Sequence, residues 1–92
     1  MDLKQHPDGK GLEFPCSLEL MAFGRNREGF ADHVVALLLS HGAQRTDAAV
    51  STRVSSAGKY VAVHIPIQVE SRQELERLYG VLQADPEIQF RL

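Results

Sequence analysis

Arginine and glycine residues gather where the first predicted strand gives way to a helix, in the stretch Gly24-Arg25-Asn26-Arg27-Glu28-Gly29. The free N–H groups and the dipole of a helix N-terminus attract carboxylates and phosphates. Arg25 and Arg27 add positive charge, and Gly29 has no side chain to keep a ligand or a second chain away from the backbone. The stretch therefore predicts a small-anion site formed by Gly24, Arg25, Asn26, Arg27 and Gly29. The alternative is an ordinary capped helix with two solvated arginines.

A second candidate site is a set of side chains that strand alternation places on one face of a sheet. Met21 and Phe23 alternate along the first strand, and Arg53, Tyr60 and His64 occupy the matching face of a hairpin. Apolar residues clustered on an exposed face are typical of surfaces that bind another protein. We expect this face to serve self-association into a homodimer. A solvated face with incidental apolar residues is the alternative.

The remaining reactive side chains form no pattern typical of catalysis or metal binding. The chain has one cysteine, Cys16, and four histidines, His6, His33, His41 and His64. None of them is spaced with another histidine, with the cysteine or with a carboxylate as zinc ligands are. No nucleophile stands with a base, and no pair of carboxylates has a reason for shifted pKa values. We therefore expect no metal, no cofactor and no enzymatic activity.

Length, charge and composition favour a single small domain in the cytoplasm. The chain has 92 residues, of which 43% are hydrophobic, and a formal net charge of −2. No stretch is long and apolar enough to cross a bilayer or to act as a signal peptide, so we expect no membrane association. One cysteine permits no internal disulfide, which favours a reducing compartment. Residues 1–11 are polar and are predicted to be a flexible tail, with the domain over residues 12–92.

The hairpin also has a weak similarity to the third strand of RNA-recognition sheets, in the residues Gly58-Lys59-Tyr60-Val61-Ala62-Val63. Those sheets stack bases on two aromatic residues of that strand. Here Ala62 takes the second aromatic position, and the acidic charge balance gives no attraction to a phosphate backbone. Nucleic acid is therefore not expected as a partner.

Hydrophobic periodicity predicts the elements that position these residues. A strand is expected over residues 17–23 and a helix over residues 27–41, with Asn26 as its N-cap and Gly42 ending it. Strands over residues 48–55 and 60–69 form a hairpin in which Val54 lies opposite Val61 and Val50 opposite Ile65. Pro66 cannot donate a ladder hydrogen bond, so a bulge or a break in pairing is expected there.

The last third of the chain predicts a helix and a final strand. Ser71-Arg72-Gln73-Glu74 is a capping box that begins the helix, and Asp85-Pro86 ends it. Ile88, Phe90 and Leu92 alternate as the last strand. The order strand, helix, hairpin, helix, strand predicts an α+β, ferredoxin-like βαββαβ sandwich. Its four antiparallel strands are expected in the order 4-1-3-2, with both helices on one face.

The chain resembles the YbeD-like family of small bacterial proteins of unknown function. The resemblance lies in Glu13-Phe14-Pro15 before the first strand, Ser55-Ser56-Ala57-Gly58-Lys59-Tyr60 at the hairpin and Leu78-Tyr79 on the second helix. It implies a ferredoxin-like fold similar to ACT regulatory domains, and genes often found near those of lipoate attachment. It implies no established activity.

The similarity to ACT domains extends to one loop. Many ACT domains carry Asp-Arg-Pro-Gly at the start of the first helix, and Arg27 and Gly29 match that motif. Asn26 replaces the acid, while Glu28 replaces the proline and brings negative charge toward a carboxylate ligand.

Together these features predict a non-enzymatic, ACT-like regulatory or small-molecule-sensing module. It would homodimerise and bind a small carboxylate at the loop around Gly29. The alternative is an adaptor that acts through the sheet face on an enzyme of lipoate-related metabolism.

Overall fold

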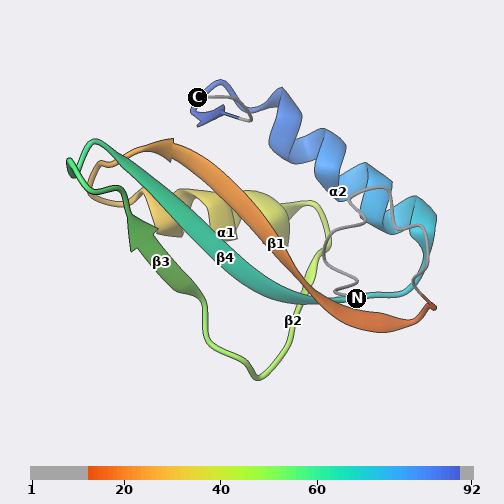
Figure 1. The fold of residues 1–92 in the computed structure, drawn as a ribbon. Helices are drawn as coiled ribbons and strands as arrows, with labels where there is room; N and C mark the ends of the chain where they lie inside the picture. The colour runs from red at the N-terminus through yellow and green to blue at the C-terminus, as the bar shows by residue number, and fades with distance from the viewer. Residues whose placement is uncertain (1–12, 90–92) are drawn as a thin grey trace.

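The computed structural model describes residues 13–89, which form five strands and two helices. The elements, in chain order, are β1 (Cys16–Arg25), α1 (Phe30–Ser40), β2 (Gln44–Arg45), β3 (Ser51–Val54), β4 (Tyr60–Val69), α2 (Arg72–Ala84) and β5 (Ile88–Gln89). Figure 1 shows their arrangement. The predicted tail over residues 1–11, and Phe90 and Leu92 of the predicted last strand, lie outside the described residues.

The centre of the sheet is the antiparallel pair of β1 and β4. Their ladder runs from Cys16 opposite Val69 to Arg25 opposite Tyr60. β5 lies on the other side of β1, and both β2 and β3 pair with β4, so the order is β2-β4-β1-β5 with β3 also on β4. In Figure 1, α1 lies behind β1 and β4. The predicted α+β, ferredoxin-like architecture is confirmed, although the strand order differs in one detail.

That detail is the predicted second strand, which the structure replaces with two short strands. The ladder on this side of β4 stops at His64 and resumes only at Ile67. Pro66 lies in the gap: it has no N–H to donate, and its carbonyl accepts a long hydrogen bond of 3.5 Å from the Thr46 N–H. The strand predicted over residues 48–55 is therefore wrong in extent. The break predicted at Pro66 is confirmed on this side, while pairing with β1 continues past it.

The predicted register of the hairpin is correct where the ladder forms. Val54 lies opposite Val61, as expected. Val50 lies outside the ladder, because β3 begins only at Ser51. Val54 lies opposite the buried Val61, which predicts burial for it as well, but it is 50% exposed, since the hairpin projects beyond the start of α1 (Figure 1).

The core lies between the helices and one face of the sheet. Alternating residues of β1 and β4 are buried there, which confirms the face predicted from their period of two. Each helix contributes one side chain per turn to the same cluster. The buried hydrophobic residues of these four elements are Leu20, Ala22, Phe30, Val34, Leu38, Val61, Val63, Ile65, Ile67, Val69, Leu75, Leu78 and Leu82.

The ends of α2 are formed by the residues that the sequence indicated. The Ser71 hydroxyl accepts a hydrogen bond of 3.1 Å from the Glu74 N–H, which satisfies a donor that the first helical turn leaves free. The Glu74 carboxylate accepts one from the Glu70 N–H at 2.8 Å, one residue before the position typical of a capping box. The helix stops at Ala84, before Asp85-Pro86. This places Asp85 and its neighbours beside the start of α1.

Candidate functional site

The face of the sheet that neither helix covers brings together the five residues predicted to form an interaction surface. By register, Met21 lies beside His64, and Phe23 lies beside Ala62, which is in turn beside Arg53. The rings of Phe23 and Tyr60 are stacked, with centroids 5.4 Å apart. Met21 is 50% exposed, one of the few large apolar side chains in residues 13–89 that are so open. We call this surface the sheet face.

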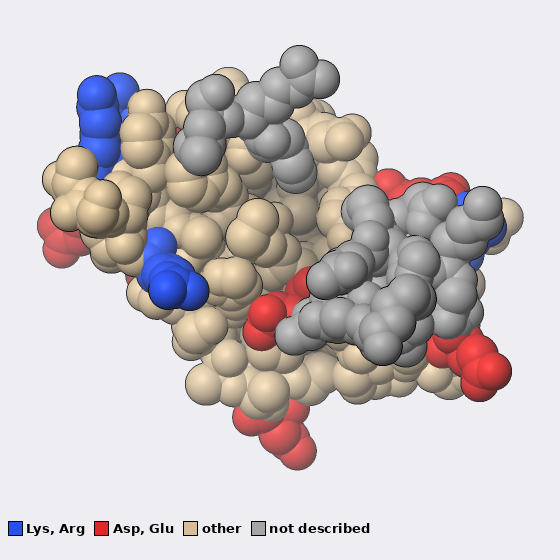
Figure 2. Space-filling view, in the orientation of Figure 1, with Lys and Arg blue, Asp and Glu red and all other residues tan. Residues whose placement is uncertain are grey.

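Acidic and basic residues lie on opposite sides of the sheet face. Glu19 contacts His64, with 3.3 Å between Oε1 and Nδ1. Arg25 and Arg53 lie nearer the hairpin, and neither side chain has a hydrogen-bond or ion-pair partner within residues 13–89. In Figure 2 the basic atoms on the left lie toward the hairpin, with one acidic group at the edge beside them, and another acidic group lies beyond the uncharged residues between them. The face therefore has an apolar centre with opposite charges on its two sides.

The loop predicted to bind an anion is held in place by its own contacts. Asn26 does not cap the helix: its N–H donates to the Lys59 carbonyl at 2.9 Å, and its Nδ2 donates to the Gly58 carbonyl at 3.0 Å. The expected helix start at Arg27 is therefore wrong. The helix begins at Phe30, and Gly29, with a φ of 85°, is its N-cap.

Gly24 is buried at the end of β1 rather than open to a ligand. A Cβ on this residue would come within 2.6 Å of both the Glu87 carbonyl oxygen and Cζ of Phe30. Gly24 is therefore needed because the Phe30 ring and the chain before β5 pack directly on its backbone. The packing supplies a reason for this glycine that involves no ligand.

Arg27 forms a bidentate ion pair with Glu87. Nε lies 2.6 Å from Oε2, and Nη2 lies 2.8 Å from Oε1. The hydrogen bond to Glu87 raises the pKa of Arg27, and the same bond lowers the pKa of the Glu87 carboxyl. Of the two arginines predicted for the anion site, Arg27 already has a carboxylate partner. Arg25 lies beside Tyr60 at the hairpin end of the sheet face.

Sequence reasoning missed the cluster that surrounds this pair. His33 Nε2 lies 2.7 Å from Asp85 Oδ2 and 3.7 Å from Glu87 Oε1. The other Asp85 oxygen accepts the Glu87 N–H at 2.8 Å. One ligand atom from each of the three residues lies within 4.8 Å of the others, a donor set that a divalent cation could use. Arg27 already supplies positive charge to Glu87, so the cluster ties α1 and the residues before it to the α2–β5 connection.

The only signal for this cluster was the pair of acids in Asp85-Pro86-Glu87, directly after α2. Because α1 and α2 run side by side in opposite directions, the end of one helix lies beside the start of the other. His33 and Asp85 are 52 residues apart, and no local spacing pattern spans that distance.

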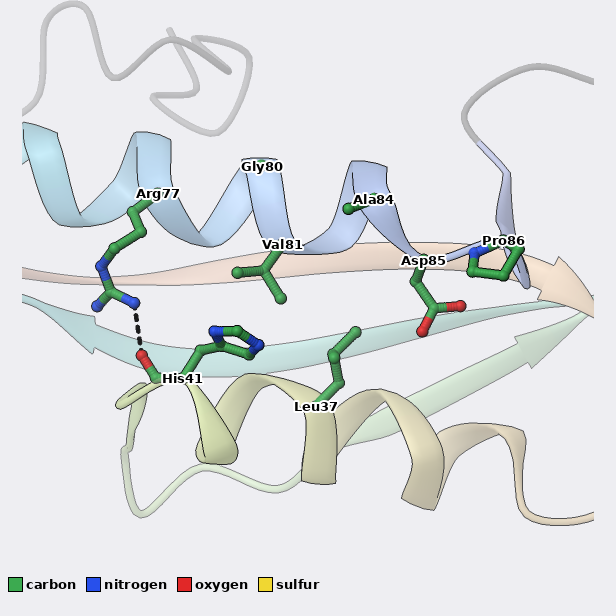
Figure 3. Close-up of a pocket in the computed structure, with 8 residues that line it drawn as sticks. All are labelled: Leu37, His41, Arg77, Gly80, Val81, Ala84, Asp85 and Pro86. Carbon is green, nitrogen blue, oxygen red and sulfur yellow. Dashed lines mark hydrogen bonds between the residues drawn. The ribbon is translucent and has the colours of Figure 1, made fainter.

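An open groove of about 450 Å³ separates the two helices on the side away from the sheet (Figure 3). Leu37, Val81 and Ala84 give it apolar walls, and Arg77 closes one end with a hydrogen bond of 2.6 Å to the His41 carbonyl. No residue of either predicted site lines it.

The thiol of Cys16 is not activated, because burial raises its pKa.

Replacing Arg27 with methionine is expected to raise the pKa of the Glu87 carboxyl toward its ordinary value. The hydrogen bond from Arg27 is the largest cause of the lowered pKa. Because the folded-state pKa lies below the unfolded one, the pair stabilises the protein above the ordinary glutamate pKa. That stability is lost as the pH falls through the lower, folded value. An NMR titration of the Glu87 carboxyl carbon measures the shift.

The matched control is Arg25→Met, which removes an arginine without touching Glu87. A Glu87 titration that is the same in the Arg27→Met variant and in the original protein would contradict the assignment of the shift to this pair.

Known proteins similar to this chain match it over most or all of their length. A family model described as "Protein of unknown function (DUF493)" matches residues 10–92. Curated relatives named UPF0250 protein, from Xanthomonas oryzae pv. oryzae (strain PXO99A) and Stenotrophomonas maltophilia (strain K279a), are each 33% identical over 92 residues, which is all of both chains. A UPF0250 protein of Shewanella amazonensis is 40% identical over 73 residues, covering 79% of this chain and 81% of the relative.

No solved structure matches the chain significantly. Neither helix within residues 13–89 has the length and apolar character needed to span a membrane. The resemblance to the YbeD-like family is confirmed, because YbeD is a UPF0250 protein. The chain therefore belongs to the DUF493 family of bacterial UPF0250 proteins, whose function is unknown.

Proposed function

We propose that the protein is a non-enzymatic, ACT-like regulatory module that acts by binding a protein through the sheet face. The observation that carries this proposal is a sheet face that neither helix covers and whose centre is apolar. Met21 is half exposed there, beside the stacked rings of Phe23 and Tyr60. Clustered apolar side chains that a fold leaves open to water are favourable sites for a protein partner, because binding removes them from water.

The electrostatics of the molecule also favour binding over catalysis. His33 and Asp85 are arranged like a base and its orienting acid. Within residues 13–89, however, no hydroxyl or thiol is hydrogen-bonded to either of them. The nearest charged groups, Glu87 and Arg27, pair with each other. The arrangement therefore supports a structural link between the start of α1 and the α2–β5 connection.

A small carboxylate at the Gly24–Gly29 loop is the second candidate. Such a ligand would have to displace Glu87 from Arg27, since the bidentate pair occupies that guanidinium. If the loop binds a carboxylate, the ligand should raise the melting temperature, and Glu87→Gln should strengthen the effect by freeing Arg27. The adaptor for an enzyme of lipoate-related metabolism uses the sheet face and is one form of the main proposal.

A photo-crosslinking residue at Met21 tests the proposal without advance knowledge of the partner. In cells that make the protein at its natural level, we expect Met21 to give a discrete protein adduct. The same residue placed at Gln73, which is exposed on α2, should give none. Phe23→Ser combined with Tyr60→Ala should abolish the Met21 adduct. Equal labelling from both positions, or no adduct from Met21, would refute a binding function of this face.

A further inference from the structure

The order of residues along the sheet face indicates which partner it fits. The row Met21–His64–Ser51 crosses the middle of the face. Arg53 lies in the next row toward the hairpin, and Glu19 lies in the next row the other way. Each row is two residues, or about 7 Å, from the middle one. Arg53 is on β3 and Glu19 is on β1, so they also lie on opposite sides of β4.

We infer that the sheet face binds a second copy of this chain, face to face, around a two-fold axis at His64. Because Arg53 and Glu19 lie at matching distances on opposite sides of His64, an axis that lies in the interface and crosses the line between them at right angles exchanges their positions. Arg53 of each copy then meets Glu19 of the other, and the contact occurs twice. The inference rests on the proposed function, since it names the partner of the same surface.

The composition of the face fits a two-fold interface. Met21 and Phe23 would be buried near the axis together with Ala62 and Pro66, which are half-buried in the single chain. The charged residues would form the rim, which is the usual anatomy of a protein interface. An acidic partner would match only the hairpin end of the face, and a basic one only the Glu19 side. A second copy is complementary to both ends at once.

The two parts of the face have different roles in the proposed dimer. The apolar centre provides affinity, because exposed ion pairs contribute little on their own. The Arg53–Glu19 contacts select the register, since a shifted or rotated copy would place like charges together. Arg53 has no side-chain partner within residues 13–89, so it can pair with the second copy without losing a contact.

The inference is tested by reversing the charges of Arg53 and Glu19 and measuring dimerisation of the full chain by analytical ultracentrifugation. We expect the original protein to dimerise, and Met21→Glu to be monomeric because it places a carboxylate at the apolar centre. Arg53→Glu and Glu19→Arg should each weaken the dimer about tenfold or more, because each places two like-charge pairs across the interface. The double variant, with both changes in one chain, should recover most of the lost affinity, since its opposite charges meet again.

Mixing the two single variants provides a second check, because their heterodimer has two favourable pairs and their homodimers have none. Lys59→Glu changes the net charge as Arg53→Glu does, but in the exposed turn of the hairpin, and should leave the dimer intact. A monomer at all concentrations, or no recovery in the double variant, would overturn the inference. If Met21 still crosslinks to a different protein in cells, the proposed function stands and only the identity of the partner fails.

Discussion

Replacing Phe30 with alanine is expected to lower the free energy of unfolding by about 3–5 kcal/mol, the usual cost of removing a buried aromatic ring. Phe30 is 1% exposed and begins α1, where its ring covers Gly24 at the end of β1. The backbone on both sides of the ring is held by the Asn26 contacts and the β1–β5 pairing, so it cannot easily close the cavity. Urea denaturation followed by circular dichroism measures the change.

Leu39→Ala is the matched control on the same helix. Leu39 is 46% exposed, so its replacement should cost far less than that of Phe30. Similar costs at the two positions would show that the Phe30 ring does not anchor the helix to the sheet.

Replacing Gly24 with valine is expected to destabilise the protein by about 1–3 kcal/mol or more, as overpacking of a full core does. An added Cβ would lie 2.6 Å from the Glu87 carbonyl oxygen, a backbone atom that cannot swing aside. It would also lie 2.6 Å from Phe30 Cζ. The melting temperature and the urea midpoint should both fall.

Gly80→Ala provides the opposite control, because a Cβ there has no neighbour within 4 Å. A glycine inside a helix costs about 0.5–1 kcal/mol relative to alanine, so this variant should be slightly more stable than the original protein.

In a Phe30→Ala background, Gly24→Ala should cost less than it does alone, since one of its two clashes is gone. A full, unchanged cost would place the obstruction at the Glu87 carbonyl alone.

The sequence was most informative where local pattern decides the structure. The alternation of β-branched residues gave the bounds of β4 correctly, because a strand buried on one face fixes its own register. Ser71 and Pro86 marked the ends of α2 for the same reason: capping and proline effects act within a few residues. The residues of the sheet face could therefore be grouped correctly from alternation and hairpin register alone.

Prediction failed where distant residues compete for a side chain. Asn26 is a good N-cap by type, yet its amide binds the hairpin more than 30 residues away, and the helix starts at Phe30 instead. Arg27 was predicted to contribute to an anion site, but Glu87, 60 residues later, forms a bidentate pair with it. Such pairings depend on the completed fold. The same is true of the His33–Asp85 contact.

The interruption at Pro66 has a consequence for how far assembly can proceed. A continuous outer strand presents a row of unpaired amides on which a foreign chain can add, and addition repeats without limit. Here the border formed by β2 and β3 is two short pieces, two and four residues long, separated at the proline. Neither piece gives an incoming strand a continuous row of amides to pair with, so the proposed face-to-face dimer would offer no template for fibril growth along this border.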